Sequence, residues 1–455
     1  MLGKIKPLLI VKFNSAVLSG GNRRTYEILR LGKSEGIDYI VVTDPSSIKN
    51  AIKMFPDYAK VLSNYRVYLK DRPKGTSKMP GLKQAFIVKG LIDFAAFVSR
   101  VIEKEKADLV VGSEEPTILL ESFISARYCG KPWTTVFQPT SDILQPSPSF
   151  CSVNAFNVLK FVSRKASTKN LSLLPRIGLA LELLIQLLVA EKSPMLSVSS
   201  SLVEDFNNIN PRIKFIVINP GNGLRTEKFS AKPFADREYD AIFFARLVPE
   251  KGLYDLIPIW KEVMRKAQKS MLAVAGVVED QRYVDNFLEA VKDNELTHNI
   301  LLLGELDEVA LIRSVKSAKL TLYPSSVDSF SLVTLESLAC GTPVVAYDIP
   351  AIRHNFGKCE AVLRCQPKDF QNMADKTVLI LKNETLRSEL KNKAREYSQR
   401  YTWSNVAKAE KEAYLKVVNT FKMPHCFFQN GFSQKGKKQA SPFKESDVDR
   451  MNPGS

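Results

Sequence analysis

Compact apolar runs alternate with amphipathic segments along almost the whole chain, and this alternation limits the possible folds more than any other feature. Apolar runs of about four to eight residues between helical patterns are typical of buried parallel strands. They stand at 7–13, 38–44, 108–113, 132–138, 195–200 and 214–221 in the first half, and at 239–247, 270–277, 299–306, 320–325 and 343–348 in the second. The sequence therefore predicts an α/β protein with two Rossmann-like, doubly wound domains.

The two β/α series follow one another without an obvious linker, and we place the hinge near residues 205–215. We expect one domain over residues 1–210 and a second over 211–401. A chain of 455 residues is long enough to give each of them its own core. The segment 423–455 is polar and rich in Gly, Ser and Lys, without periodicity, which is typical of a disordered tail.

The few histidines and cysteines exclude several classes of site. All three histidines lie in the second half, which argues against HExxH proteases and against a Ser-His-Asp triad in the first half. The six cysteines form no CxxC pair, so neither a disulfide framework nor a structural metal is expected, and a reducing compartment fits. The apolar segment 176–190 contains Glu182 and is too short for a bilayer span. We expect a cytoplasmic protein that docks, if at all, at the inner face of a membrane.

The chain carries a formal net charge of +17, and its basic residues concentrate between Lys49 and Lys89. Ten Lys or Arg residues stand there against Asp57 and Asp71, and the Pro and Gly residues predict a mobile basic loop. One interpretation is a solvated surface; another is peripheral contact with anionic lipid or a phosphate-bearing acceptor, through loop 49–89 and helix 176–190. No nucleic-acid-binding motif accompanies the charge, so nucleic acid is not expected as a partner.

Two cations follow a predicted strand of the second half. Arg246 ends the run 239–247, and Lys251 opens the next helix. Ligands of doubly wound domains bind at such carboxyl ends of parallel strands. A guanidinium and an ammonium can bracket a diphosphate there, although two surface cations are the more common interpretation of such a pair taken alone.

A loop of small residues, 325–331, follows the strand 320–325 and leads into the helix LVTLESLACG. Its amides and the helix N-terminus near Ser329–Ser331 can bind an anion. Glu336 falls at the edge of the buried stripe of this helix, where a carboxylate needs partners such as paired ribose hydroxyls or other protein groups. Gly304, in the loop Gly304-Glu305-Leu306 that ends the run 299–306, is a weaker candidate for seating a nucleobase.

These segments together resemble a known family. RLVPEKG and the stretch from NILLLGEL to VVAYDIPAI resemble the retaining glycosyltransferases of family 4 (glycosyl transferases group 1), which have the GT-B fold. Asp328 and Glu336, eight residues apart, match the family's pair of acidic residues. Gly20-Gly21, the linker INPGNGLRTEKF and the helices of 383–418 also match in order.

The resemblance implies a site and an activity. The family transfers a sugar from a nucleotide sugar, such as a UDP- or GDP-sugar, with retention at the anomeric carbon and without a required metal. It implies that Arg246 and Lys251 hold the diphosphate, that Glu336 binds ribose and that Asp328 binds donor-sugar hydroxyls. The amides of Phe330 and Ser331 would face the sugar or phosphate, with Ser329 at the same helix end. Gly20 and Gly21 would let the first-domain loop close over the diphosphate. The helix at about 402–421 would pack back on the first, acceptor-binding domain.

Two positions depart from the family pattern. Asp328 stands where the family usually has Glu, which implies either an inward shift of the loop or a different donor sugar. Gln138 stands where many members have His that touches the donor sugar; an amide can still hydrogen-bond a hydroxyl. These departures keep a second hypothesis open, a catalytically inactive nucleotide-sugar-binding or scaffold protein. A sugar-nucleotide epimerase, which can share the two-domain shape, is a third.

Overall fold

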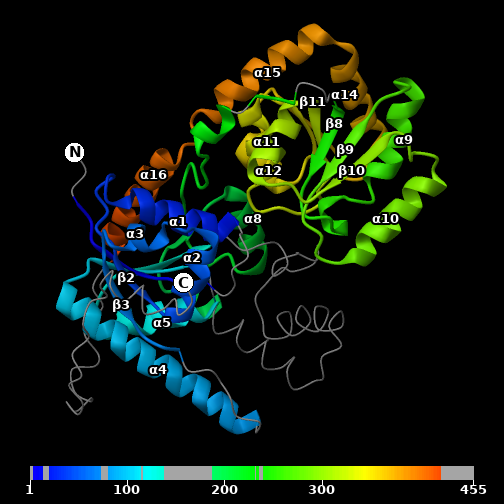
Figure 1. Ribbon diagram of the computed structural model, residues 1–455. Helices are drawn as coiled ribbons and strands as arrows, with labels where there is room; N and C mark the ends of the chain where they lie inside the picture. Colours follow the sequence, from blue (N-terminus) through cyan, green and yellow to red (C-terminus); the bar gives the residue numbers. More distant parts are fainter. Residues whose placement is uncertain are drawn as a thin grey trace.

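Two parallel sheets, each covered by helices on both faces, form the two halves of the molecule (Figure 1). The computed structural model describes residues 4–13, 20–72, 80–113, 116–137, 187–230, 232–234 and 239–421. Gln138, the disordered tail expected at 423–455, and most of the helix expected at 176–190 lie outside these residues. The expected fold class is confirmed.

The first sheet has seven strands in the order β3-β2-β1-β4-β5-β6-β7. Their bounds are β1 Pro7–Ile10, β2 Ile40–Thr43, β3 Arg66–Leu69, β4 Leu109–Gly112, β5 Trp133–Phe137, β6 Met195–Ser197 and β7 Phe215–Val217. Alternate residues of β1 face opposite layers: Leu9 packs with helix α1 (Gly20–Gly32), and Leu8 packs with α4 (Pro80–Glu105) and α5 (Pro116–Tyr128). Both faces are therefore buried, which explains the continuous apolar runs. Because β7 completes this sheet, the first domain extends a few residues beyond 210.

The second sheet has six strands in the order β10-β9-β8-β11-β12-β13. Their bounds are β8 Tyr239–Phe244, β9 Leu272–Ala275, β10 Ile300–Gly304, β11 Ala318–Tyr323, β12 Val344–Tyr347 and β13 Val362–Cys365. The helices are α9 Leu256–Lys266, α10 Gln281–Asp293, α11 Glu308–Lys316, α12 Leu332–Cys340, α13 Pro350–Phe356, α14 Phe370–Lys382 and α15 Glu384–Ser398. Ile242 and Phe244 of β8 pack toward α11, whereas Ala241 and Phe243 face the larger core with α9.

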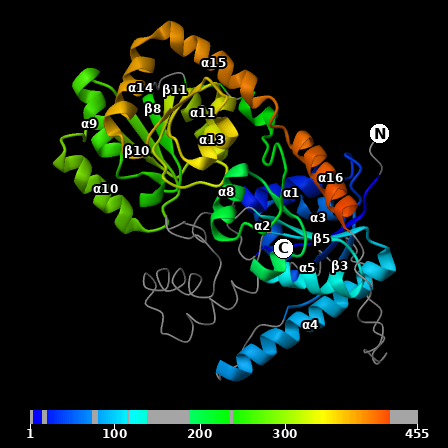
Figure 2. The ribbon, with the colours of Figure 1, turned by 180° about the vertical axis from the view of Figure 1, so that it is seen from behind.

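The last helix, α16 (Trp403–Thr420), returns from the second half to the first and lies beside α1 (Figures 1 and 2). Trp403, Val406 and Tyr414 belong to the core of the first domain. Where the chain crosses between the halves, Leu224 donates a backbone hydrogen bond of 2.7 Å to Tyr401. Both connections between the domains therefore run side by side.

The basic region 49–89 was expected to be a mobile loop, but the described part of it is mostly regular structure. Much of it is regular structure: α2 (Pro45–Met54), α3 (Tyr58–Leu62), β3 and the start of α4. Tyr58, Val61 and Val67 are buried, whereas Lys49, Lys53, Lys60 and Lys89 are exposed. Residues 73–79 of the expected loop lie outside the described residues. Asp44 caps α2 by accepting 2.9 Å from the Ser47 amide.

None of the described helices is both long enough and apolar enough to cross a bilayer.

Candidate functional site

The loop that carries Lys251 and the loop after β11 are joined at the carboxyl edge of the second sheet. Lys251 ends the short 3₁₀ helix Pro249–Lys251, and Gly252 follows with φ +88°. A Cβ at Gly252 would lie 2.1 Å from the Pro324 carbonyl oxygen, so only glycine permits this approach. The Ser326 amide donates 3.1 Å to the Glu250 carbonyl and completes the junction.

Lys251, Asp328 and Tyr323 form one compact network at this junction. The Lys251 Nζ lies 3.2 Å from Asp328 Oδ2, 3.0 Å from the Val327 carbonyl oxygen and 3.4 Å from the Tyr323 hydroxyl. The Tyr323 hydroxyl donates to the same Oδ2 at 2.5 Å. Asp328 Oδ1 accepts from the amides of Ser329 at 2.8 Å and Phe330 at 3.4 Å.

Opposite charges in this network outweigh the cost of burying them. Burial acts to lower the pKa of Lys251, but Tyr323 and Asp328 hold it above its usual value. Burial acts to raise the pKa of Asp328, but the Lys251 ammonium and the Tyr323 hydroxyl hold it below its usual value. Burial and the Asp328 charge raise the pKa of Tyr323 to about 12. At neutral pH the network holds an ammonium, a carboxylate and a neutral phenol.

Arg246 lies just beyond β8 but has a different partner. Its Nη1 donates 2.8 Å to Glu279 Oε1 in the loop after β9, and the pair is partly exposed. Lys251 therefore faces Asp328 while Arg246 faces Glu279, and the two cations do not share a carboxylate in this structure.

The N-terminus of α12 begins at Ser331, which has φ +72° and caps the helix. The Ser331 hydroxyl accepts 3.3 Å from the Thr334 amide. The preceding residues are fixed from the first domain: the Ser201 hydroxyl of α8 (Ser200–Ile209) donates 2.7 Å to the Ser329 carbonyl. The Phe330 side chain is buried against the rings of Phe356 and Tyr401. The Phe330 backbone is held as well: its amide donates 3.4 Å to Asp328 Oδ1, and its carbonyl accepts 3.2 Å from the Asn355 side-chain amide.

Glu336, one turn further along α12, lines a pocket of about 240 Å³ between the two domains. Its other lining residues are mainly apolar: Phe229, Phe244, Leu306, Leu311, Ile312, Val315 and Cys340, with Glu308 and Arg23 at the polar side. Arg23 Nη1 lies 3.5 Å from Glu336 Oε1, and Arg23 Nη2 lies 3.5 Å from Glu308 Oε1. Burial raises the pKa of Glu336; Arg23 opposes that shift and Glu308 adds to it.

The glycine end of α1 approaches the same region. A Cβ at Gly20 would lie 3.0 Å from Leu332 Cδ1, in the first turn of α12. Gly20 therefore brings the first domain close to the N-terminus of α12, and Gly21 follows it in the first turn of α1. Gly304 ends β10 with φ +70° and has open space where a Cβ would stand, so its conformation, rather than crowding, favours glycine.

The comparisons with known proteins identify the second domain. Residues 225–397 match the family described as glycosyl transferases group 1. The second domain of this chain belongs to that family. It is similar to a glycogen synthase of Mycobacterium tuberculosis, with 25% identity over 52% of this chain and 57% of that protein. It is also similar to a phosphatidyl-myo-inositol mannosyltransferase of Mycobacterium leprae, with 26% identity over 44% of this chain and 53% of that protein. The chain thus spans little more than half the length of these relatives.

Solved structures extend the likeness over both domains. A glycosyltransferase from Rickettsia africae ESF-5 matches with a TM-score of 0.63 at 15% identity, covering 92% of this chain and all of the other. Anabaena Alr3699/HepE in complex with UDP matches with a TM-score of 0.63 at 15% identity, covering 90% of this chain and all of the other. These matches agree with the GT-B fold of the group 1 glycosyltransferases.

Among the expected site residues that the structure describes, Gly20 approaches α12 from the first domain, and Glu336 contacts Arg23 across the two domains. Lys251 and Asp328 meet, whereas Arg246 and Glu336 each contact other partners. The Asp328 carboxylate, expected to contact sugar hydroxyls, accepts four hydrogen bonds from the protein in this structure. Sequence reasoning missed Tyr323 and Arg23. The position of Tyr323 at the end of a predicted strand could have suggested the former; no local pattern relates Arg23 to Glu336.

Proposed function

We propose that this chain is a retaining glycosyltransferase that moves a sugar from a nucleotide sugar, such as a UDP- or GDP-sugar, to an acceptor without a required metal. The observation that carries the proposal is the position of Lys251: its ammonium stays charged beside the N-terminus of α12, opposite the glycine end of α1. The family match of residues 225–397 supports the same function.

In this proposal the leaving diphosphate is stabilised by fixed positive charge. The charge that develops as the glycosidic bond breaks is neutralised by Lys251 and by the N-terminus of α12. The guanidinium of Arg246 also contributes, after it releases Glu279 and binds phosphate oxygens instead. Charge arranged in advance of the reaction is usually the largest contribution to catalysis. The amides of Gly20 and Gly21 approach the diphosphate from the first domain.

The pocket beside Glu336 suits the nucleoside part of the donor. The Glu336 carboxylate can accept from both ribose hydroxyls, and Leu306 and Phe244 offer apolar surface for a base. In this structure the Arg23 guanidinium contacts one oxygen of the Glu336 carboxylate. When ribose binds, Arg23 either shares this carboxylate with the ribose hydroxyls or moves away from it.

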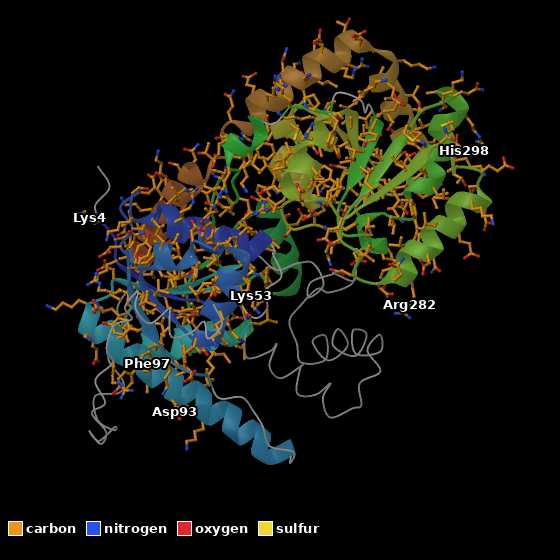
Figure 3. The ribbon with its side chains drawn as sticks, in the orientation of Figure 1. Lys4, Lys53, Asp93, Phe97, Arg282 and His298 are labelled. Carbon is orange, nitrogen blue, oxygen red and sulfur yellow. The ribbon has the colours of Figure 1, made fainter. Side chains whose placement is uncertain are left out.

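We infer that the acceptor is lipid-linked or otherwise anionic and that transfer takes place at the cytoplasmic face of a membrane. The similarity to a phosphatidyl-myo-inositol mannosyltransferase supports this inference. So do Lys49, Lys53 and Lys60, which are exposed on α2 and α3 of the first domain. Lys53 is labelled in Figure 3. An anionic surface would attract such side chains.

The test is a screen of radiolabelled nucleotide sugars against a membrane lipid extract, with the product identified by mass and its linkage by NMR. Arg246→Ala and Lys251→Ala should each abolish transfer while the fold is retained. Arg282→Ala is the matched control, because Arg282 is an exposed cation on α10 whose partner is Asp280 (Figure 3). Full turnover in either cleft variant would contradict the assigned roles. Thermal stabilisation by nucleotide sugars without transfer or hydrolysis would instead identify an inactive binding protein.

A further inference from the structure

The Asp328 carboxylate has no acceptor position left for a substrate. A carboxylate offers about four lone-pair positions. Two of them, on Oδ1, take the amides of Ser329 and Phe330, and two, on Oδ2, take the Tyr323 hydroxyl and the Lys251 ammonium. A sugar hydroxyl would have to displace one of these donors, and three of the four lie within 3.2 Å.

The short side chain of Asp328 explains this arrangement. A carboxylate on Cβ can fold back onto the amides one and two residues ahead, which is the usual turn geometry of Asp. With Oδ1 fixed on its own loop, Oδ2 points at Tyr323 and Lys251 instead of away from the loop. A glutamate would carry its carboxylate one methylene further out.

Lys251, in contrast, keeps one partner that a ligand can replace. An ammonium has three protons, and here they face Asp328, the Val327 carbonyl and the Tyr323 hydroxyl. The Tyr323 contact is the longest, at 3.4 Å, and the phenol already donates its proton to Asp328. A phosphate oxygen can therefore take the place of Tyr323 on Lys251 while Asp328 continues to hold the ammonium.

We propose that Asp328 positions Lys251 for the donor diphosphate and makes no contact with the donor sugar, and that Tyr323 fixes Asp328 in this role. The inference rests on the proposed function, since it concerns the same site. It separates the two acidic residues of the site: Glu336 binds the nucleoside, whereas Asp328 acts through Lys251.

A second network of the same composition offers a matched control. At the end of the neighbouring strand β12, the Tyr347 hydroxyl donates 2.9 Å to Asp255 Oδ2, and Lys368 Nζ lies 2.7 Å from Asp255 Oδ1. Tyr347 is as deeply buried as Tyr323, but its lysine partner is 63% exposed. Tyr347→Phe therefore removes an equivalent hydroxyl without touching Lys251.

The experiment is calorimetric titration with a nucleoside diphosphate and with the corresponding nucleotide sugar, using whichever of UDP, GDP, ADP and dTDP the wild type binds most tightly. Asp328→Asn removes the charged partner of Lys251, and both affinities should fall by the same factor, on the order of tenfold. Tyr323→Phe should lower both together, by about threefold. Tyr347→Phe should change neither.

The outcomes separate the inference from the proposed function. If Asp328→Asn leaves the diphosphate affinity unchanged or higher, or weakens the nucleotide sugar much more than the diphosphate, then Asp328 is a sugar ligand and the inference is wrong. If Tyr347→Phe lowers affinity as much as Tyr323→Phe, the effect is one of general stability and the assignment to Tyr323 is also wrong. If the wild type binds no nucleoside diphosphate at all, it is the proposed function that fails.

Discussion

The guanidinium of Arg23, on the first domain, lies 3.5 Å from the Glu336 carboxylate on the second. The same side chain reaches Glu308 at 3.5 Å, and Lys228 pairs with Glu308 from the other side. Both carboxylates line the pocket beside α12. Arg23 and Lys228 act to lower the pKa of Glu336 and Glu308 acts to raise it, so a first-domain cation contributes to the electrostatic environment of the residue proposed to bind ribose.

This relationship predicts a pH effect. Burial raises the pKa of Glu336, and the Arg23 charge keeps that rise in check. Protonated Glu336 accepts ribose hydroxyls less well, so nucleotide affinity should fall as the pH decreases through the Glu336 pKa. In Arg23→Gln the opposing charge is lost, the pKa of Glu336 rises further, and the fall in affinity should begin at higher pH. Nucleoside diphosphate titrations between about pH 5 and pH 8 measure the shift.

Arg30→Gln is the control for this prediction. Arg30 is on the same helix but pairs with Glu27 inside the first domain, 2.7 Å away. Its substitution should leave the pH profile of nucleotide binding in place. Coincident profiles for wild type and Arg23→Gln would mean that Glu336 is ionised independently of Arg23.

The fold could be predicted from the sequence because it depends on local patterns. The candidate site could be predicted only in part. Buried parallel strands are continuous apolar runs, and these gave eleven of the thirteen strands that the structure describes. The strand β3 escaped because Arg66 and Tyr68 interrupt a run of only four residues. The Arg23–Glu336 contact joins residues 313 positions apart in the sequence. Which donors hydrogen-bond to the Asp328 carboxylate depends on side-chain geometry. Neither leaves a pattern in a single sequence.

The buried pair of Arg24 and Glu410 predicts a stability effect at the domain junction. Arg24 on α1 pairs with Glu410 on α16 and donates 2.7 Å to the Gly221 carbonyl in the connecting segment. Tyr414 donates 2.7 Å to the same carboxylate. Removing one partner leaves a buried charge uncompensated, so Glu410→Gln should lower the free energy of unfolding by about 3–5 kcal/mol.

Glu412→Gln serves as the comparison for Glu410→Gln, because Glu412 is exposed two residues along the same helix. Its melting temperature should match that of the wild type. Equal melting temperatures for the two variants would show that the Arg24–Glu410 pair does not hold α16 against α1.

Glu121 on α5 predicts a dependence of first-domain stability on pH. Burial raises its pKa from 4.5 to about 7, although Arg72 lies 2.9 Å away and acts to lower it. The folded state keeps this proton up to about pH 7, whereas the unfolded chain releases it near 4.5. The stability that the protonated group contributes is complete below pH 4.5 and is lost as the pH rises through 7.

Glu121→Gln should remove most of that pH dependence, about 3 kcal/mol over the interval. Urea unfolding at about pH 5 and about pH 7.5 measures it, with the exposed Glu103→Gln as the control on the adjacent helix. The free energy of unfolding could instead change between the two pH values as much in Glu121→Gln as in Glu103→Gln. That result would assign the pH dependence to another group.

The backbone conformation of Ser331 predicts that two small substitutions there differ in their effect on stability. Its φ of +72° disfavours any residue with a Cβ, while its hydroxyl caps α12 by accepting from the Thr334 amide. Ser331→Ala keeps the strained backbone and loses the cap, and should lower the free energy of unfolding by about 1 kcal/mol. Ser331→Gly also loses the cap but relieves the strain, and should stay within a few tenths of a kcal/mol of the wild type. Urea unfolding decides between them: an alanine variant as stable as the glycine variant would mean that the left-handed backbone at Ser331 is not maintained. Because this residue starts the helix whose N-terminus is proposed to face the diphosphate, the same ranking should appear in nucleotide affinity.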